Sequence, residues 1–218
     1  MHTDIQRTAR GYYKELKKVI DETDFDNIQK IAEVLLGVYE NDKTVFIFGN
    51  GGSASTASHM AADFSKGTLK NVYNADEKRF RVISLTDNVA AMTAFANDLS
   101  YDDMFSQQLH NLVRTGDVVI GISGSGNTPN VIKAFMHARQ VGATTIGLLG
   151  FITGGKAKEF CDHCIIVPSN NYGIIEDFHA SLGHVLTTAL SAMKSAEKGG
   201  KRTARLRPRE WTERSARR

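Results

Sequence analysis

Val118-Val119-Ile120-Gly121-Ile122 is an apolar run that passes directly into the polar loop Ser123-Gly124-Ser125-Gly126-Asn127-Thr128. An earlier junction has the same form, with Val45-Phe46-Ile47-Phe48 leading into Gly49-Asn50-Gly51-Gly52-Ser53. Continuous apolar runs that precede helix-like stretches are typical of parallel strands buried on both faces. Each loop then lies at the carboxyl end of a strand, where glycine admits a close ligand and helix N–H groups attract an anion. The two junctions together predict an anion site, most simply for a phosphate.

The loops lack the signatures of the common nucleotide sites. Either loop alone is weak evidence, because a Gly/Ser-rich turn after a strand also occurs as a plain βα connection. Neither loop continues into the Gly-Lys-Ser/Thr of a P-loop, and neither reads G-x-G-x-x-G with an acidic residue about 20 positions later. We therefore expect a phosphorylated metabolite rather than ATP or a dinucleotide.

Strand-like and helix-like segments alternate along the chain, which predicts a doubly wound α/β domain. The five expected strands are 44–48, 79–85, 117–122, 144–149 and 164–167. Helices are expected at 4–22, 24–40, 53–66, 88–96, 104–112, 129–140, 156–160 and 172–195. The result is a parallel, flavodoxin-like sheet with an N-terminal helical pair and a long C-terminal helix. Ser53 is the expected N-cap of its helix, and Asn97-Asp98 is expected to end the helix before it reaches residue 97.

Composition indicates one globular domain. The chain has 218 residues, of which 41% are hydrophobic, and it has neither an apolar run of about 18 residues nor a visible signal peptide. We therefore expect a cytoplasmic protein with no membrane span. Cys161 and Cys164 have the C-x-x-C spacing of redox or zinc sites. Without a second cysteine pair, we interpret them as strand-edge thiols of a reducing compartment.

The positive charge belongs to the C-terminal segment. Residues 198–218 hold nine Lys/Arg and two Glu, whereas the whole chain has a net charge of +3, so residues 1–197 are negative overall. Gly199-Gly200 separates this basic segment from a domain expected over 1–197. We interpret 198–218 as a solvated, disordered tail. Nucleic-acid binding is not the expected role, because Trp211 is the tail's only aromatic residue.

Two helices offer side chains for acid–base or metal chemistry. His59 and Asp63 are four positions apart and therefore share one helix face. The last helix offers Glu176, His179 and His184, of which His179 lies three positions from Glu176. Carboxylates and imidazoles beside a phosphate crevice suit proton transfer next to a sugar carbonyl, or a divalent ion such as zinc. The alternative is ordinary: a satisfied core histidine and a helix-surface pair, since the sequence does not show that the helices meet.

Five segments together resemble the sugar isomerase (SIS) domain family, and within it the phosphoheptose isomerases. Their order and spacing agree from about residue 5 to residue 192. They are residues 49–53, Ser58-His59-Met60-Ala61-Ala62-Asp63, Ala96-Asn97-Asp98 with Phe105-Ser106, Gly116-Asp117 through Thr128, and Glu176 through His184.

The resemblance implies a homotetramer that converts sedoheptulose 7-phosphate to D-glycero-D-manno-heptose 7-phosphate in the cytoplasm. It implies that the phosphate is held by Ser123, Gly124, Ser125 and Thr128. The sugar site would contain Asn50, Gly51, Gly52, Ser53, Asn97, Asp98 and Glu176. Zinc would be bound by His59, Asp63, Glu176 and His184. Asp63, Glu176 and His184 would perform the proton transfers.

Two positions depart from the pattern of that family. Asp63 stands where a glutamate serves as base and ligand, so its carboxylate is one methylene shorter, and Glu176 stands where glutamine is usual. One explanation is that Glu176 takes over as the base. The other is that the two changes together indicate a different phosphosugar substrate, such as that of an amino-sugar isomerase or an etherase. A further alternative is a non-catalytic SIS-domain protein that binds phosphosugars or regulates a partner, of the type that associates with a replication initiator.

Overall fold

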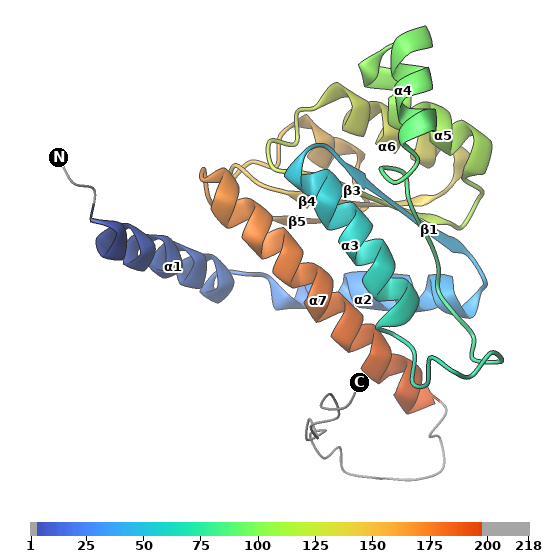
Figure 1. The fold of residues 1–218 in the computed structure, drawn as a ribbon, viewed down its shortest axis with the longest axis horizontal. Coiled ribbons are helices and arrows are strands. Elements are labelled where there is room, and N and C mark those ends of the chain that lie inside the picture. Colours follow the sequence, from blue (N-terminus) through green and yellow to red (C-terminus); the bar gives the residue numbers. More distant parts are fainter. Residues whose placement is uncertain (1–3, 198–218) are drawn as a thin grey trace, which may run out of the picture.

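Five parallel strands form one sheet in the order β2-β1-β3-β4-β5 (Figure 1). The computed structural model describes residues 4–197. The strands are β1 (Thr44–Gly49), β2 (Arg81–Ser84), β3 (Val118–Ser123), β4 (Thr144–Leu149) and β5 (His163–Ile166). The order reverses between β1 and β3, because β1 pairs with β2 on one side and with β3 on the other. The predicted doubly wound parallel sheet is therefore confirmed.

Helices cover both faces of the sheet. One face packs against α2 (Phe25–Glu40), α3 (Gly52–Lys66) and α7 (Tyr172–Glu197). The other packs against α5 (Met104–Leu112) and α6 (Pro129–Val141). The remaining helical segments are α1 (Ile5–Asp21), α4 (Val89–Asp98) and the 3₁₀ turns η1 (Tyr101–Asp103) and η2 (Lys156–Phe160). Because helices cover both faces, the central strands β1 and β3 are buried at every position rather than at alternate ones.

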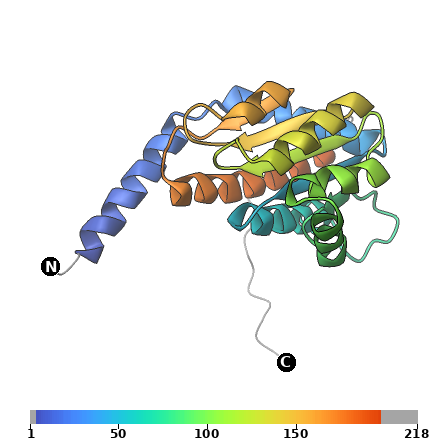
Figure 2. The same cartoon turned by 90° about the horizontal axis from the view of Figure 1, so that it is seen from above.

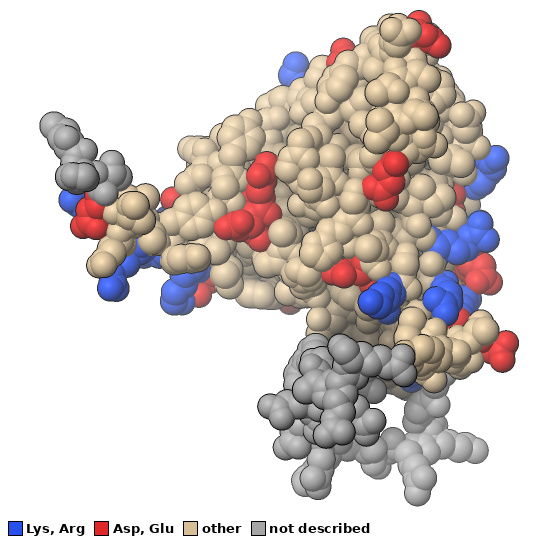
Figure 3. Space-filling model, in the orientation of Figure 1, with Lys and Arg blue, Asp and Glu red and all other residues tan. Residues whose placement is uncertain are grey.

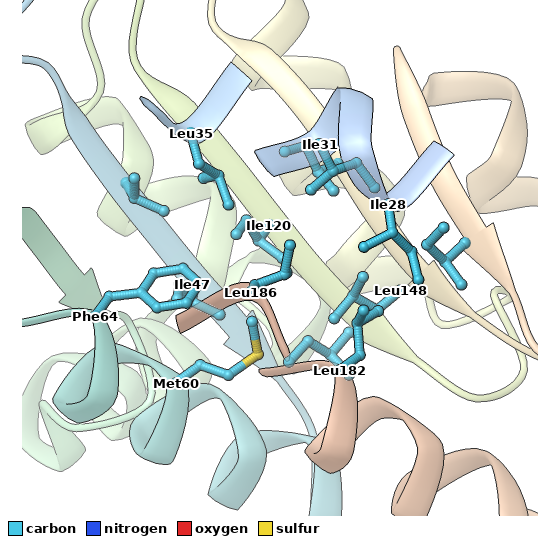
Figure 4. Close-up of a cluster of buried hydrophobic side chains, with 14 of the residues drawn as sticks. Ile28, Ile31, Leu35, Ile47, Met60, Phe64, Ile120, Leu148, Leu182 and Leu186 are labelled. Atoms are coloured by element: carbon cyan, nitrogen blue, oxygen red, sulfur yellow. The ribbon is translucent and has the colours of Figure 1, made fainter. Parts of the chain in front are cut away.

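The larger hydrophobic cluster joins α3 and α7 to the sheet. Figure 4 shows Met60 and Phe64 of α3 beside Leu182 and Leu186 of α7, all packed toward the strands. Leu186 is 1% exposed and Phe64 is fully buried. Burying side chains of this size contributes about 1.5–3 kcal/mol each. This packing fixes α3 and α7 side by side, so polar residues on their outer faces lie near one another.

Three local boundaries differ from the sequence-based expectation. The helix α3 begins at Gly52 and has Gly51 as its N-cap, without a side-chain hydrogen bond, so Ser53 is not the cap. The cause is the left-handed conformation of Gly51 (φ 57°), which turns the chain into the helix one residue earlier. The helix α4 includes Asn97 and Asp98 and ends when the N–H of Leu99 bonds to the Phe95 carbonyl. The strand β2 is shorter than expected and lies at a sheet edge.

The helix α1 projects from the body of the molecule (Figures 1 and 2). Tyr12 donates a 2.6 Å hydrogen bond to Asp177, and Ser169 donates one of 2.6 Å to Glu15, so α1 is attached near the start of α7. Ile5 and Tyr13 of α1 are 77% and 68% exposed. A helix with exposed apolar residues at a projecting position is typical of a protein–protein contact.

The described surface mixes positive and negative groups. On the face in Figure 3, most Lys and Arg side chains lie along α1 and at the opposite lower corner of the body, and acidic side chains lie among them. The basic segment 198–218 lies outside the described residues, so its predicted disorder stays a prediction. Within residues 4–197, no helix combines the length and the apolar character that a membrane crossing requires.

Candidate active site

The two polar loops lie next to each other at the carboxyl edge of the sheet. Gly49 at the end of β1 pairs with Ile122 near the end of β3, so the loops that follow begin at the same level. The helix after β1 packs on one face of the sheet and the helix after β3 packs on the other. The two loops therefore lie at the topological switch point of the sheet, where ligands of doubly wound proteins bind.

The loop after β3 is held by hydrogen bonds from its own backbone N–H groups to its own serine hydroxyls. Ser123 accepts a 3.1 Å hydrogen bond from the N–H of Gly126, and its hydroxyl lies 3.4 Å from that of Thr128. Ser125 accepts from the N–H of Asn127 at 3.2 Å. Gly126 is required here, because its φ is +62° and a Cβ would lie 1.9 Å from the Gly154 carbonyl oxygen. The helix α6 begins directly afterwards, with Thr128 as an N-cap that forms no side-chain cap bond.

The loop after β1 is equally tight. A Cβ at Gly49 would lie 2.7 Å from the Ser53 Cβ and 2.8 Å from the Ile122 carbonyl oxygen, so the two loops approach closely only because this residue is glycine. Gly51 and Gly52 are exposed, whereas Ser53 is buried. The N–H of Ser53 donates to the Asn50 carbonyl at 3.0 Å. The exposed glycines leave their backbone accessible to solvent, as expected for a site where a ligand approaches the main chain.

A buried side-chain network that the sequence analysis missed joins the two loops. Asn130, in the first turn of α6, is fully buried. It exchanges hydrogen bonds with Asn50 in both directions, at 3.0 and 3.2 Å. The hydroxyl of Tyr101 in η1 donates to Asn50 Oδ1 at 2.8 Å. An isolated Asn in a helical first turn is commonly exposed, so sequence offered little signal for this network.

Across the α3–α7 interface, two imidazoles surround one carboxylate. His184 Nδ1 lies 3.0 Å from Asp63 Oδ2, and His59 Nε2 lies 3.5 Å from the same oxygen. The rings of His59 and His184 are 4.9 Å apart between centroids. Ligand atoms of the three residues all lie within 4.8 Å of one another. Two nitrogens and one carboxylate oxygen at this separation fit a zinc ion, whose catalytic sites use three protein ligands and one open position.

Glu176 lies apart from that group, at the first loop. A Cβ on Gly52 would lie 2.7 and 2.8 Å from the two carboxylate oxygens of Glu176, so the carboxylate rests on the start of α3. Glu176 and His184 are eight positions apart on one helix, which separates them by about 12 Å along its axis. Glu176 is not part of the group formed by His59, Asp63 and His184. The structure thus assembles three of the four expected metal ligands and places the fourth beside the predicted sugar site.

His179 is a core residue. Its ring is 1% exposed, and Nε2 lies 3.1 Å from the Leu149 carbonyl oxygen, to which it donates because a carbonyl only accepts. Burial lowers the pKa of His179 to about 4, and the bond to Leu149 opposes that shift. The structure therefore favours the ordinary alternative, a core histidine, over a position on the same side as Glu176. Only Nε2 has a partner, because Nδ1 is buried without a hydrogen bond among the described residues. The helix α7 presents His179 to the end of β4 and Glu176 to Gly52 at the start of α3.

Asn97 and Asp98 lie in the last turn of α4 and bond to each other at 2.9 Å. Neither forms a hydrogen bond with the two loops in the described chain. The segment that follows them contains Tyr101, whose hydroxyl donates a hydrogen bond to Asn50. Their predicted role in sugar binding remains a prediction.

Cys161 and Cys164 are free thiols whose pKa values are raised by burial. Both are free, and Cys161 donates from Sγ to the Ala157 carbonyl at 3.2 Å. Burial raises the pKa of Cys161 to about 12 and also raises that of Cys164. Thiols that stay protonated are poor nucleophiles and poor metal ligands. This agrees with the expectation of strand-edge thiols rather than a redox pair.

Comparison with known proteins assigns the fold and the site to one family. The family model described as the SIS domain matches residues 11–150. The chain belongs to the SIS domain family. A SIS-family relative from Clostridium acetobutylicum, a phosphoheptose isomerase, is 35% identical over 187 residues, which cover 85% of this chain and 92% of that protein. A phosphoheptose isomerase from Helicobacter pylori is 37% identical over 182 residues, covering 84% of this chain and 91% of that protein.

Solved SIS-domain structures agree with these relatives. The phosphoheptose isomerase from Neisseria gonorrhoeae has a TM-score of 0.78 and 30% identity, and the match covers 87% of this chain and 100% of that one. The phosphoheptose isomerase from Francisella tularensis also has a TM-score of 0.78, at 24% identity, which shows the shared fold. These matches extend well past residue 150, so they include the helix that carries Glu176 and His184. The family resemblance expected from the sequence motifs is confirmed.

Proposed function

We propose that this SIS-domain protein is a phosphoheptose isomerase, which interconverts sedoheptulose 7-phosphate and D-glycero-D-manno-heptose 7-phosphate. The observation that carries the proposal is the joint placement of the hydroxyl-rich loop after β3 and the His59–Asp63–His184 group on helices that start at the same sheet edge. A phosphosugar isomerase needs both parts: an anion site that holds the substrate, and acid–base groups at the other end of the sugar.

The substrate would be held at its phosphate by the loop after β3. Ser123, Ser125 and Thr128 offer hydroxyl groups, and Gly124 offers backbone, at the start of α6 where the helix dipole favours an anion. Residues 50–53 would line the sugar, with Asn50 as a side-chain donor. Asn97 and Asp98 would contact the sugar from the end of α4. Hydroxyl groups and backbone N–H groups suit a phosphate that stays attached throughout the reaction.

The reaction needs a base beside the carbonyl and an acid that returns the proton. The base removes a proton from the carbon next to the carbonyl, an enediolate forms, and the proton is returned to the neighbouring carbon. Glu176 is the better candidate for the base, because its carboxylate lies at the first loop and is not engaged by a histidine. His184 is the candidate acid and base for the oxygen atoms, and Asp63 orients it across 3.0 Å.

Zinc is the proposed cofactor. His59, Asp63 and His184 would hold the ion, and Glu176 lies outside this group in the chain as described. A bound zinc ion supplies Lewis-acid stabilisation of negative charge on a carbonyl oxygen. The short side chain of Asp63 reaches both imidazoles, so the missing methylene does not by itself remove the ligand group.

The protein is proposed to act as a homotetramer in the cytoplasm. Support comes from α1, which projects from the body with exposed apolar residues, and from α4, which has no buried residue of its own (Figure 1). Val89 of α4 is 66% exposed. Helices of this kind acquire a buried face when another copy packs on them. Light scattering of the purified protein measures the assembly directly.

The test of the proposed function is a proton NMR time course of sedoheptulose 7-phosphate with purified protein and added zinc. Appearance of the anomeric signal of heptose 7-phosphate supports the isomerase. A parallel reaction with an amino-sugar phosphate tests the other phosphosugar chemistries. Binding of sedoheptulose 7-phosphate without turnover, in the presence of zinc, would contradict the proposal and favour a non-catalytic phosphosugar-binding role.

A further inference from the structure

The amide of Asn130 has its orientation fixed by the main chain. Its Nδ2 lies 3.4 Å from the backbone carbonyl of Tyr101, and a carbonyl oxygen only accepts. Oδ1 of Asn130 therefore faces the other way and accepts from Asn50 Nδ2 at 3.0 Å, while Nδ2 also donates to Asn50 Oδ1 at 3.2 Å. Every polar atom of this fully buried side chain has a partner.

Asn130 in turn fixes the orientation of Asn50. With Asn50 Nδ2 donating to Asn130, the oxygen of Asn50 must accept from Asn130, and the hydroxyl of Tyr101 must donate to that same oxygen at 2.8 Å. One Nδ2 hydrogen of Asn50 is used in this network. The second hydrogen remains for a ligand, so the network determines which group Asn50 presents to the sugar.

The same three side chains tie together the segments that form the site. Asn50 belongs to the loop after β1, Asn130 follows the loop after β3, and Tyr101 follows α4 through the end that carries Asn97 and Asp98. A buried, fully bonded polar group is costly to leave unpaired, so the network favours one arrangement of the three segments.

We propose that Asn130 is a positioning residue, which acts on the sugar phosphate through Asn50 and keeps the two loops in register. The inference rests on the proposed function, in which Asn50 contacts the sugar. It adds a fully buried residue from the core of the domain that determines how tightly the substrate is bound.

The sharpest variant is Asn130→Asp, which keeps the shape of the side chain. One carboxylate oxygen still accepts from Asn50 Nδ2, but the other faces Asn50 Oδ1 and the Tyr101 carbonyl, both of which accept only. A protonated carboxyl still donates a hydrogen bond to one of these acceptors, whereas an ionised carboxylate repels both of them. We expect the KM for sedoheptulose 7-phosphate, relative to wild type, to rise about tenfold as the introduced carboxyl ionises between about pH 6 and 8.5, with a smaller change in kcat.

A matched control is Thr145→Val on β4. Thr145 is fully buried, and its hydroxyl lies 2.7 Å from the Phe160 carbonyl and 2.9 Å from the Asp162 carboxylate, one of which accepts its hydrogen. The hydroxyl also accepts from the Asp162 N–H at 3.0 Å, so its loss removes buried hydrogen bonds. It has no link to Asn50, so its KM is expected to stay within about twofold of wild type at every pH. A purely structural role for Asn130 predicts that the two variants behave alike, with a KM ratio that does not depend on pH, and this result would overturn the inference.

A second variant covers the case in which Asn130→Asp does not fold. Tyr101 is 55% exposed, and Tyr101→Phe removes only the hydroxyl that donates to Asn50. We expect its KM to rise about threefold to fivefold, and an unchanged KM would count against the network. An inactive wild type would contradict the proposed function instead. In that case, crystal structures of Asn130→Asp or Tyr101→Phe decide: a displaced Asn50 side chain supports the positioning role, and an unmoved one overturns it.

Discussion

His184 Nδ1 lies 3.0 Å from Asp63 Oδ2, and this contact joins α7 to α3 at the outer face of their interface. The side chains are 59% and 30% exposed, so solvent reaches both. The contact exists because Met60 and Phe64 of α3 and Leu182 and Leu186 of α7 hold the two helices together on the inner side (Figure 4). Core packing on one side of each helix thus assembles the polar group on the other.

Removal of His184 is expected to release zinc and to slow isomerisation. His184→Asn takes away one of the three ligands, which typically weakens metal binding and activity by at least about 100-fold. The measurement is zinc content by mass spectrometry after dialysis, together with kcat. His110→Asn on the exposed part of α5 is the matched control and is expected to keep both. Full zinc content in His184→Asn would contradict the proposed ligand group.

The two carboxylates are expected to have separable roles. Glu176→Gln should retain zinc and lose about 10²- to 10⁴-fold in kcat, because it removes a base without touching the His59–Asp63–His184 group. Asp63→Asn should lose both zinc and activity. Exchange of the substrate proton with deuterated solvent measures the base step directly. Asp177→Asn, the neighbouring carboxylate bonded to Tyr12, is the control and should exchange normally. Normal exchange in Glu176→Gln would move the base to Asp63.

Gly52 is expected to be essential for the position of Glu176. A methyl group there would lie 2.7 and 2.8 Å from the carboxylate oxygens, so Gly52→Ala should displace that carboxylate while leaving its charge in the chain. A displacement of about 1 Å costs about 100-fold in rate. Gly37→Ala in α2 is the control, since no atom lies within 4 Å of its Cβ position and activity should be unchanged. Equal kcat values for the two variants would contradict a catalytic role for Glu176.

The sheet could be predicted because its strands are short apolar runs between clear helix signals. The strand at 144–149 was predicted with the bounds that the structure has, and Gly142 before it has the left-handed φ of 80° expected of a helix end. The length of the edge strand β2 was overestimated. Phe80 was counted in the strand because it is apolar, but it lies before the strand and packs on Tyr39 in the core. An apolar run predicts burial more reliably than it predicts strand length.

The site could be predicted only in part, because it depends on tertiary packing. The spacing of His59 and Asp63 showed that they share a face, but the contact with His184 requires α3 and α7 to pack side by side. The side that His179 faces could not be decided from the sequence, because α7 is apolar on more than one side and the pattern does not separate the face toward the sheet from the face that carries Glu176. Asn130 escaped notice because a polar residue in a helical first turn is ordinary unless the structure buries it.

Lys194 is expected to be important for stability. Its ammonium group is 3.8 Å from Glu77, donates to the Thr68 carbonyl at 2.9 Å and lies 4.6 Å from the centre of the Tyr39 ring. Lys194→Met removes a buried ammonium group that bonds to the Thr68 carbonyl and lies near the Glu77 carboxylate, and the loss of one member of such a buried group costs about 3–5 kcal/mol. Lys78→Met is the matched control: Lys78 also lies over Tyr39, at 5.1 Å, but is more exposed. It should cost about 1 kcal/mol or less. Equal losses in urea unfolding would contradict this difference.

His179 is expected to make the domain less stable in mild acid. The folded protein holds this imidazole neutral, with a pKa of about 4 against 6.5 for an unburied histidine, so only the unfolded chain takes up a proton between these values. The stabilisation is therefore complete above about pH 6.5 and is lost as the pH falls toward 4. The total corresponds to about 3 kcal/mol.

The comparison that isolates this effect is wild type against His179→Asn. The asparagine amide still offers a donor for the Leu149 carbonyl but does not titrate. Urea unfolding at several pH values should show the wild type losing about 3 kcal/mol more than the variant between pH 7 and 4. His137, whose pKa is also lowered by burial, is present in both proteins, so its contribution cancels. Parallel stability curves would mean that His179 is protonated in the folded state and that water or another group reaches it.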